Sequence, residues 1–236
     1  MNILIPAAGL GTRFIDSKYK LPKPNILVNG LPMLVAAAKS LRFIGTYIFV
    51  IRENEYRESL AKHIFQNFPL VKVAVIDFDT DGAAETALIA EDLIKDKELI
   101  LANCDQIMDN DWNPDIAIKQ LRKYDGGVVT VDSSDSKHSY AAIENNLVRK
   151  IEEKSVISDK ALTGLHYWKN GTDFIDSAKD LMSKDYRTLN EFYIGPTYNV
   201  LIGQNKKIGF HNIPNNQIHF IGTPEDLELY ESRQTE

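Results

Sequence analysis

The sequence predicts an α/β fold in which helices flank a doubly wound, mostly parallel (mixed) sheet. Short apolar segments alternate with amphipathic ones through the first half of the chain, a small-residue turn follows the first apolar segment, and an acidic residue follows a later one. Buried parallel strands joined by helices give this alternation, and such sheets bind ligands beyond the carboxyl ends of their strands. The 236 residues contain no repeat or linker-like stretch, so we expect a single domain spanning 1–236.

The first half of the chain has the more regular pattern. Apolar segments of strand length alternate in it with longer segments that have an apolar face. We expect strands at 2–6, 46–51, 71–76 and 98–103, and helices at 31–43, 53–65 and 83–94.

The second half is less regular and richer in strands. The turn at Asn145-Asn146 separates two of its strand segments. We expect strands at 127–132, 140–144, 147–152, 162–168, 207–212 and 217–221, and helices at 172–182, at 190–202 and after Thr223.

The composition excludes several classes of protein. A hydrophobic fraction of 44% and a charged fraction of 25% are usual for a soluble globular chain, and the single cysteine, Cys104, fits a reducing compartment. No apolar run approaches the roughly 20 residues that span a bilayer. The formal net charge of −6 opposes general binding to nucleic acid. We therefore expect a cytoplasmic protein with no membrane or nucleic-acid partner.

A turn of small residues follows the first strand. Ala7, Ala8, Gly9 and Gly11 allow a ligand to approach the backbone closely, and successive N–H groups of such a turn can bind an anion. The spacing is not that of a dinucleotide-binding fingerprint, because Phe14 stands where the third glycine belongs, nor is it that of a P-loop. A tight strand-to-helix turn would also explain the glycines by themselves.

Basic residues follow this turn, among them Arg13 and Lys23. Pro22 and Pro24 flank Lys23 and fix the backbone around it, which gives its ammonium a defined direction. A lysine suits a phosphate as a point charge, and an arginine suits it as a forked donor. A solvated surface loop would carry the same charges. Because both residues lie in loops, we expect their substitution to impair ligand binding with little loss of stability.

The order of these and later motifs resembles that of the sugar-phosphate nucleotidyltransferase family, whose members carry Ala-Gly-x-Gly-Thr-Arg…Pro-Lys on a GT-A-like, Rossmann-like sheet. The resemblance covers nearly the whole chain. Further matching segments are Gly82-Ala83-Ala84, Ala102-Asn103-Cys104-Asp105, Ile151-Glu152-Glu153-Lys154, Leu162-Thr163-Gly164-Leu165-His166-Tyr167, Glu191-Phe192-Tyr193 and Gly222-Thr223-Pro224-Glu225-Asp226-Leu227.

The resemblance implies an enzyme that transfers a nucleoside monophosphate unit from a nucleoside triphosphate to a phosphorylated small molecule and releases pyrophosphate. It implies a nucleotide-binding half at about 1–130 and an acceptor-binding half at about 131–236. The implied catalytic residues are Arg13, Lys23 and Asp105; the implied nucleotide-binding residues are Ala7, Ala8, Gly9, Gly11, Thr12, Arg13, Lys23, Gly82 and Asn103; the implied acceptor-binding residues are Glu153, Lys154, Gly164 and Glu191.

The resemblance also implies that Asp105 binds Mg²⁺. Many family members place a second metal-binding aspartate two residues before the late Gly-Thr, where this chain has Phe220. A phenylalanine cannot bind a hard cation, which prefers oxygen ligands. Either Asp105 holds the metal together with phosphate oxygens and water, or a neighbour such as Asp226 supplies a second ligand.

Similarity to bacterial capsule and surface-polysaccharide nucleotidyltransferases favours CTP or UTP as the donor and a role in making polysaccharide precursors. Smaller branches of the family include cytidylyltransferases that act on non-sugar phosphates such as phosphocholine. Sugar-1-phosphates and other small phosphomonoesters therefore both stay open as acceptors. The sequence leaves the oligomeric state undetermined.

Two alternative functions remain. A GT-A glycosyltransferase would use a ready-made nucleotide-sugar, and its Asp-x-Asp hallmark occurs at Asp77–Asp79, Asp79–Asp81 and Asp109–Asp111, although such pairs are common by chance in an acidic protein. A non-catalytic nucleotide-binding protein would explain the missing second aspartate. Release of pyrophosphate distinguishes the first alternative, and tight triphosphate binding without turnover would identify the second.

Overall fold

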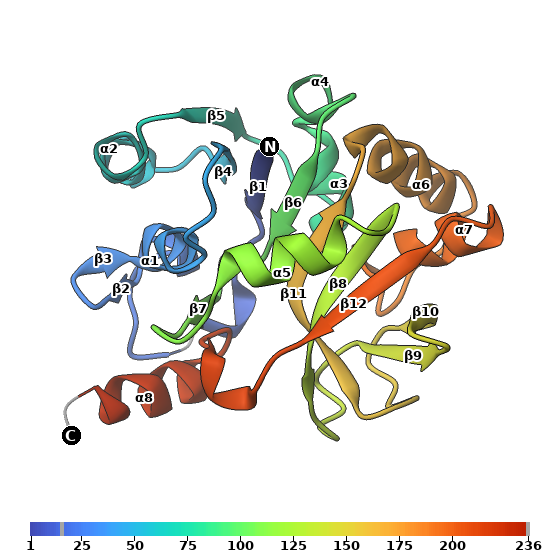
Figure 1. Cartoon of the computed structure of the whole chain (residues 1–236). Helices are drawn as coiled ribbons and strands as arrows, with labels where there is room; N and C mark the ends of the chain where they lie inside the picture. The colour runs from blue at the N-terminus through green and yellow to red at the C-terminus, as the bar shows by residue number, and fades with distance from the viewer. Residues whose placement is uncertain (15–16, 235–236) are drawn as a thin grey trace.

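The computed structural model describes residues 1–14 and 17–234, and a mixed sheet forms their centre (Figure 1). The strands of this sheet are β1 (Asn2–Ala7), β4 (Thr46–Arg52), β5 (Val71–Ile76), β6 (Leu99–Ala102), β8 (Gly126–Asp132), β9 (Tyr140–Glu144), β10 (Leu147–Glu152), β11 (Lys160–Trp168) and β12 (Ile208–Asn212). The spatial order is β10-β9-β11-β6-β1-β4-β5, and β8 joins β11 to β12.

The parallel part of the sheet comes from the first half of the chain. Strand β1 pairs in parallel with β4 and β6, and β4 pairs in parallel with β5. Strand β11 then lies antiparallel to β6 and β8, which joins the second half of the chain to the same sheet. The predicted fold class is confirmed.

Helices cover both faces of the sheet. The helices α1 (Met33–Ser40), α2 (Arg57–Asn67) and α5 (Pro114–Leu121) contribute to the apolar core on one face, and α3 (Ala83–Leu88), α4 (Glu91–Ile94), α6 (Gly171–Ser183) and α7 (Thr197–Gly203) contribute to the core on the other. Alternate residues of β1 enter the two cores, Ile3 and Ile5 on one side and Leu4 on the other. This two-residue period is that of a strand buried on both faces.

A third apolar cluster connects the segment after β1 to the end of the chain. Phe14, in a 3₁₀ turn at Thr12–Phe14, packs in this cluster with Ile26, Ile107, Ile221 and Leu227. The elements that frame it are a 3₁₀ turn at Lys23–Asn25, the ribbon of β2 (Leu27–Val28) and β3 (Leu31–Pro32), the ribbon of β7 (Gln106–Met108) and β13 (Ile218–Phe220), and α8 (Pro224–Arg233). A further 3₁₀ turn spans Asn215–Gln217.

Four predicted helices differ from the structure, and the one expected at 53–65 is shifted to Arg57–Asn67. The helix expected at 83–94 is split into α3 and α4, and the helix expected at 31–43 starts only at Met33, because Leu31 and Pro32 pair with β2. The helix expected at 190–202 is confined to α7, which starts after Pro196. Proline disfavours helical geometry in the residue before it, and Asn190 has a left-handed φ of 63°, so the segment before Pro196 forms a turn instead.

The helix α5 was not predicted, although the sequence contains its start signal. The Asn113 side chain accepts hydrogen bonds from the backbone N–H groups of Asp115 and Ile116, and Pro114 occupies the first turn. Asparagine at the N-cap followed by proline is a preferred helix beginning.

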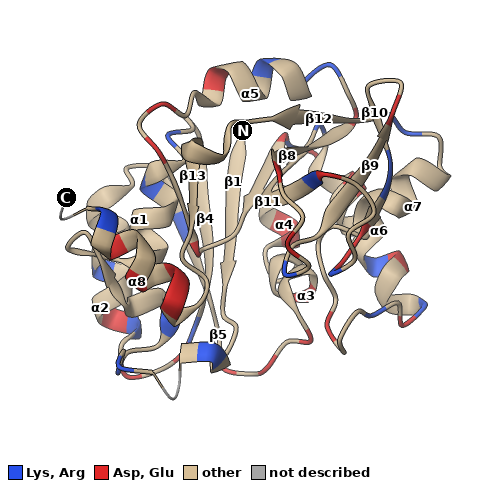
Figure 2. Cartoon of the chain, turned by 90° about the horizontal axis from the view of Figure 1, so that it is seen from below, with Lys and Arg blue, Asp and Glu red and all other residues tan. Residues whose placement is uncertain are grey.

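Charged residues lie mainly on helices and loops, whereas β1 in the centre of the sheet carries none (Figure 2). Within residues 1–14 and 17–234 we find no helix with the length and apolar character needed to cross a membrane.

Candidate active site

The small-residue turn brings the backbone against Lys23. Ala7 ends β1 and is buried together with Ala8, while Gly9 is exposed. Gly11 has a left-handed φ of 63°, and a Cβ placed on it would lie 2.9 Å from the Cβ of Lys23. Both the backbone conformation and this close approach require glycine. The turn and the Pro22-Lys23-Pro24 segment therefore form one surface.

Lys23 and Asp105 form an ion pair across this surface. Strands β1 and β6 are parallel neighbours, so the segments that follow their carboxyl ends meet at one edge of the sheet. The Lys23 Nζ lies 2.6 Å from the Asp105 Oδ2, with 15% and 24% of the two side chains exposed. The contact joins positions 82 residues apart, and it places two of the predicted catalytic residues together.

Each partner of this pair stabilises the charge of the other. Burial favours a neutral Asp105, but the Lys23 ammonium and the Arg13 guanidinium outweigh burial and lower the pKa of Asp105. Burial likewise disfavours the Lys23 ammonium, but Asp105 outweighs it and raises the pKa of Lys23. Burial raises the pKa of the neighbouring Cys104 thiol to about 11, which makes that residue unsuitable as a nucleophile.

The charge of Arg13 acts on predicted residues of both the nucleotide and the acceptor groups. Its side chain is exposed in the turn at Thr12–Phe14, as is that of Thr12. Burial lowers the pKa of Lys154, the Glu153 carboxylate opposes this, and the Arg13 guanidinium lowers that pKa further. One cation thus acts electrostatically on both Asp105 and Lys154.

Three of the predicted acceptor residues, Glu153, Lys154 and Glu191, interact with Tyr193, which the sequence analysis did not select. Glu153 is 8% exposed and accepts a hydrogen bond from the Ser139 hydroxyl, and burial raises the pKa of its carboxyl. The Lys154 ammonium donates to the backbone carbonyl of Lys137 and lies 5.9 Å from the centre of the Tyr193 ring. Burial and then the carboxylates of Glu191 and Glu153 raise the pKa of Tyr193. Its position in the Glu191-Phe192-Tyr193 motif was the available signal.

The remaining predicted residues connect the two groups. The backbone N–H of Asn103 donates to the carbonyl of Gly164 over 3.1 Å, which joins β6 to β11 beside Asp105. Gly82 lies against the segment that carries Glu191, because a Cβ on Gly82 would be 2.6 Å from the carbonyl oxygen of Phe192. The φ of Gly82 is 129°, a conformation that only glycine adopts readily.

Asp105 is the residue of this site best suited to a divalent cation. A Cβ on Gly222 would lie 2.8 Å from its Oδ2, so the late Gly-Thr segment packs directly on the carboxylate. The Phe220 ring lies 4.7 Å from the ring of His138, and Asp226 pairs with Lys137 at 3.2 Å. The part of the chain that the structure describes contains no group of three His, Cys, Asp or Glu residues able to hold a metal. Magnesium needs only one or two carboxylates when it keeps water and binds phosphate oxygens, and Asp105 fits that mode. A ligand role for Asp226 stays a prediction.

The Asp-x-Asp pairs are engaged elsewhere. Asp79 contacts Arg52 at 2.6 Å, Asp81 contacts Arg187 at 2.8 Å, and Asp109 contacts His219 at 3.2 Å.

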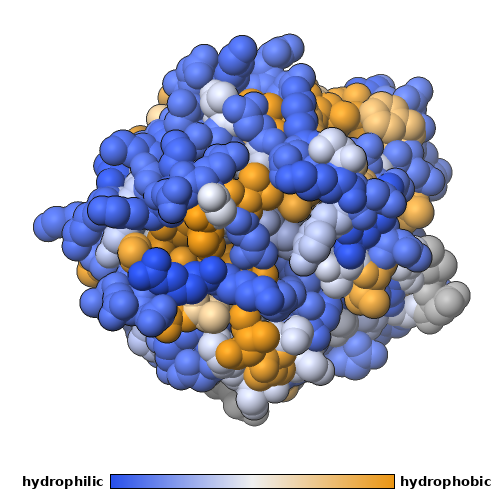
Figure 3. All heavy atoms as spheres, turned by 90° about the vertical axis from the view of Figure 1, so that its right-hand side faces the viewer, coloured by the Kyte–Doolittle hydropathy of each residue, from blue (hydrophilic) through white to orange (hydrophobic). Residues whose placement is uncertain are grey.

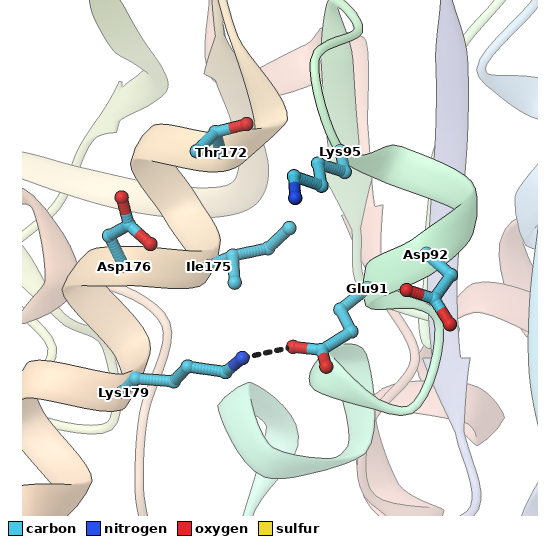
Figure 4. Close-up of a pocket in the computed structure, with 7 residues that line it drawn as sticks. All are labelled: Glu91, Asp92, Lys95, Thr172, Ile175, Asp176 and Lys179. Atoms are coloured by element: carbon cyan, nitrogen blue, oxygen red, sulfur yellow. Dashed lines mark ion pairs between the residues drawn. The ribbon is translucent and has the colours of Figure 1, made fainter.

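Among the described residues, two cavities outside this site can be named. The first, of about 140 Å³, lies between α4 and α6, and Figure 4 shows Lys179 reaching from α6 to Glu91, with the Nζ 2.5 Å from the Oε2. Its Thr172 bonds to Asp96, which precedes β6, so this cavity is at the opposite end of β6 from Asp105. The second is a groove of about 610 Å³ between β10, α6 and α7, on the mainly hydrophilic side seen in Figure 3.

Solved structures with the same fold cover nearly the whole chain. A nucleoside-diphosphate-sugar pyrophosphorylase from Vibrio cholerae RC9 superposes with a TM-score of 0.86 at 23% identity, over 99% of this chain and 100% of that one. The inositol-1-phosphate CTP transferase of T. maritima gives 0.73 at 17% identity, over 98% and 93%. A UDP-glucose pyrophosphorylase complexed with UDP-glucose gives 0.75 at 16% identity, over 98% of both chains.

The chain has the fold of the sugar-phosphate nucleotidyltransferases. The predicted resemblance to this family is confirmed, and sequence relatives agree with it. Two proteins described as bifunctional protein GlmU, from Methanocaldococcus jannaschii and Methanococcus aeolicus, are each 26% identical to the chain, over 65% and 72% of it. The matched regions cover 36% and 40% of those proteins, so the chain spans less than half the length of these relatives. No protein-family model matches the chain.

Proposed function

We propose that this protein is a magnesium-dependent nucleotidyltransferase that transfers a nucleoside monophosphate unit from a nucleoside triphosphate to a small phosphomonoester and releases pyrophosphate. The observation that supports this most strongly is the contact of 2.6 Å between Lys23 and Asp105, beside a small-residue turn on a nucleotidyltransferase fold. A cation and a carboxylate placed together beside backbone N–H groups suit a triphosphate and its metal.

The transfer needs little covalent help from the protein. An oxygen of the acceptor phosphate attacks the α-phosphorus of the triphosphate, the bond from that phosphorus to the β-phosphate oxygen breaks, and pyrophosphate leaves with the bonding electrons. A phosphate monoester is already largely ionised near neutral pH, so no general base is required. Catalysis then depends on alignment and on stabilisation of the charge that develops.

Residues of the site have distinct parts in this reaction. The turn from Ala7 to Thr12 positions the phosphates through its backbone, while Lys23 and Arg13 hold the negative charge of the leaving group. Asp105 would hold Mg²⁺. When bound, Mg²⁺ supplies positive charge that offsets the repulsion between the two phosphate-bearing substrates.

The acceptor binds on the side of Lys154. The Lys154 ammonium is the cation available for the acceptor phosphate, and Glu153 and Glu191 are available for its polar groups, with Gly164 bordering the site. We assign a sugar-1-phosphate or another small phosphomonoester as the acceptor, CTP or UTP as the favoured donor, and surface-polysaccharide precursor synthesis in the cytoplasm as the setting. Resemblance to other family members supports these assignments.

A pyrophosphate-release screen tests the proposal. The common triphosphates are crossed with sugar-1-phosphates and small phosphomonoesters in the presence of Mg²⁺, with acceptor-free reactions and the Asp105→Asn variant as controls. Pyrophosphate release that requires both an acceptor and Asp105 supports the proposal. Turnover of a nucleotide-sugar without pyrophosphate would instead identify a glycosyltransferase, and tight triphosphate binding without any turnover would identify a non-catalytic binding protein.

A further inference from the structure

One oxygen of the Asp105 carboxylate, Oδ2, is in close contact with its surroundings. Its Oδ2 lies 2.6 Å from the Lys23 Nζ, and a Cβ on Gly222 would lie 2.8 Å from the same atom. The Asp105 carbonyl accepts a hydrogen bond of 2.9 Å from the N–H of Ile221, which fixes the backbone around it. The ammonium therefore occupies one of the two oxygens through which this carboxylate could bind another cation.

The groups around this carboxylate leave it no net negative charge. Lys23 and Asp105 carry opposite unit charges, the Arg13 guanidinium also acts on Asp105, and Phe220 adds no charge at the position that holds a second aspartate in many family members. Asp226, the residue considered from the sequence as a second ligand, is paired with Lys137 at 3.2 Å. A divalent cation approaching Asp105 would meet no net negative charge and would be repelled by an ammonium in contact with its ligand.

We infer that Lys23 excludes a free divalent cation from Asp105 until a triphosphate draws the ammonium away. The inference rests on the proposed function, because it takes the triphosphate as the natural ligand of Lys23. The phosphates offer the ammonium a stronger set of acceptors than one carboxylate, and their charge removes the barrier to the cation. The exchange needs only rotation of the lysine side chain, since Pro22 and Pro24 hold the backbone.

This exchange determines the order in which the nucleotide and the metal bind. The protein alone keeps both charges satisfied, and the metal enters together with the nucleotide. A stable metal-loaded protein without nucleotide does not form, so the carboxylate is protected from wrong cations between turnovers.

Binding of Mn²⁺ as a probe, measured by electron paramagnetic resonance without any nucleotide or acceptor, tests the inference. Lys23→Met removes the ammonium but keeps most of the side-chain stem, and we expect it to bind Mn²⁺ at least about tenfold more tightly than the wild type. Lys23→Arg keeps the charge and is the matched control, with affinity close to that of the wild type. The double variant Lys23→Met/Asp105→Asn should lose the gain, which assigns the bound ion to Asp105.

Equal Mn²⁺ affinity of the wild type and Lys23→Met would overturn the inference, as would a gain that persists in the double variant. Circular dichroism checks that each variant is folded, and Lys23→Gln replaces Lys23→Met if the latter is not. Because no nucleotide is present, the result does not depend on turnover. A failed pyrophosphate assay with a positive Mn²⁺ result would refute the proposed reaction and leave the competition between Lys23 and the cation established.

Discussion

At the nucleotide side of the site, Lys23 and Asp105 touch and stabilise each other's charge, whereas at the acceptor side Glu153 and Lys154 adjoin in sequence but bond to different groups. In the first pair the pKa of Lys23 is raised and that of Asp105 is lowered, so both groups favour their charged forms. On the acceptor side burial prevails, so the pKa of Glu153 rises and that of Lys154 falls. Both of these groups are shifted toward their neutral forms.

The difference indicates how each side prepares for its ligand. A buried charge is stable when an opposite charge or hydrogen-bond donors compensate for the lost water. The nucleotide side supplies this compensation within the protein, and under the proposed function it exchanges that compensation when the triphosphate binds. The acceptor side leaves its charges incompletely compensated, and under the same proposal the phosphate and polar groups of the acceptor complete them.

The largest expected effect is on turnover. Asp105→Asn keeps the shape of the side chain but removes the charge that we propose holds the cation, and we expect a loss of about 10²–10³-fold in kcat. Steady-state pyrophosphate release measures it, with circular dichroism to confirm the fold. Turnover like that of the wild type would mean that Asp105 does not hold the metal, and the contrast between the two sides would lose its basis.

The ion pair should also contribute to stability. Lys23→Met leaves the Asp105 carboxylate without its partner, and we expect it to lower the free energy of unfolding by about 1–3 kcal/mol and to raise KM for the triphosphate. Lys20→Met is the matched control in the same segment, because Lys20 is exposed and its partner among the described residues is the carbonyl of Ser17 at 3.5 Å. Urea unfolding measures the free energy of unfolding of both variants. Equal stability of the two would show that the pair contributes nothing.

The junction of the two sides depends on Gly82. Gly82→Ala imposes a Cβ 2.6 Å from the Phe192 carbonyl oxygen at a φ of 129°, and we expect a stability loss of about 1–3 kcal/mol. Gly203→Ala is the control, because a Cβ there meets nothing within 4 Å. Thermal unfolding that leaves Gly82→Ala as stable as Gly203→Ala would contradict the described packing of Gly82 on Phe192.

The smallest expected effect is a pH dependence from Glu153. Its raised pKa means that the folded protein keeps this proton after the unfolded chain has lost it, so stability falls as the pH rises above 4.5 through the raised value. Glu153→Gln removes this loss, and we expect it to be more stable than the wild type at pH 8 but not at pH 4. Urea unfolding at both pH values measures the difference. Glu144→Gln, at an exposed site, should not become more stable than the wild type at pH 8. If it does, the pH dependence cannot be assigned to Glu153.

Local sequence signals were sufficient for most of the fold. The apolar alternation identified the strands that became β1, β4, β5 and β6, and the small-residue turn was placed correctly after β1. The segment before Pro196 was misjudged because its apolar residues suit a helix, whereas the proline and two residues with left-handed φ form a turn. The pair Asn113-Pro114 is a sequence signal for the N-terminus of α5, and the predicted helices did not include it.

The site was less accessible to sequence reasoning because its central contact is not local. Lys23 was expected to lie in a loop and to cost little stability when replaced, but the parallel pairing of β1 with β6 brings it onto Asp105 and largely buries it. Which basic side chain contacts Asp105 depends on strand order and side-chain burial, and the spacing of the motifs reveals neither. Tyr193 was not selected although it belongs to the Glu191-Phe192-Tyr193 motif, and its proximity to Lys154 arises only in the folded chain.

The central claim is that an acceptor phosphate attacks the α-phosphorus of a triphosphate held at Lys23 and Asp105. Mass spectrometry of the products formed from an acceptor whose phosphate oxygens carry oxygen-18 tests it most directly. We predict that every labelled oxygen stays in the joined product, including the new bridge to the nucleotide, and that the pyrophosphate is unlabelled. Nucleoside monophosphate and pyrophosphate formed beside an unchanged labelled acceptor would contradict the account.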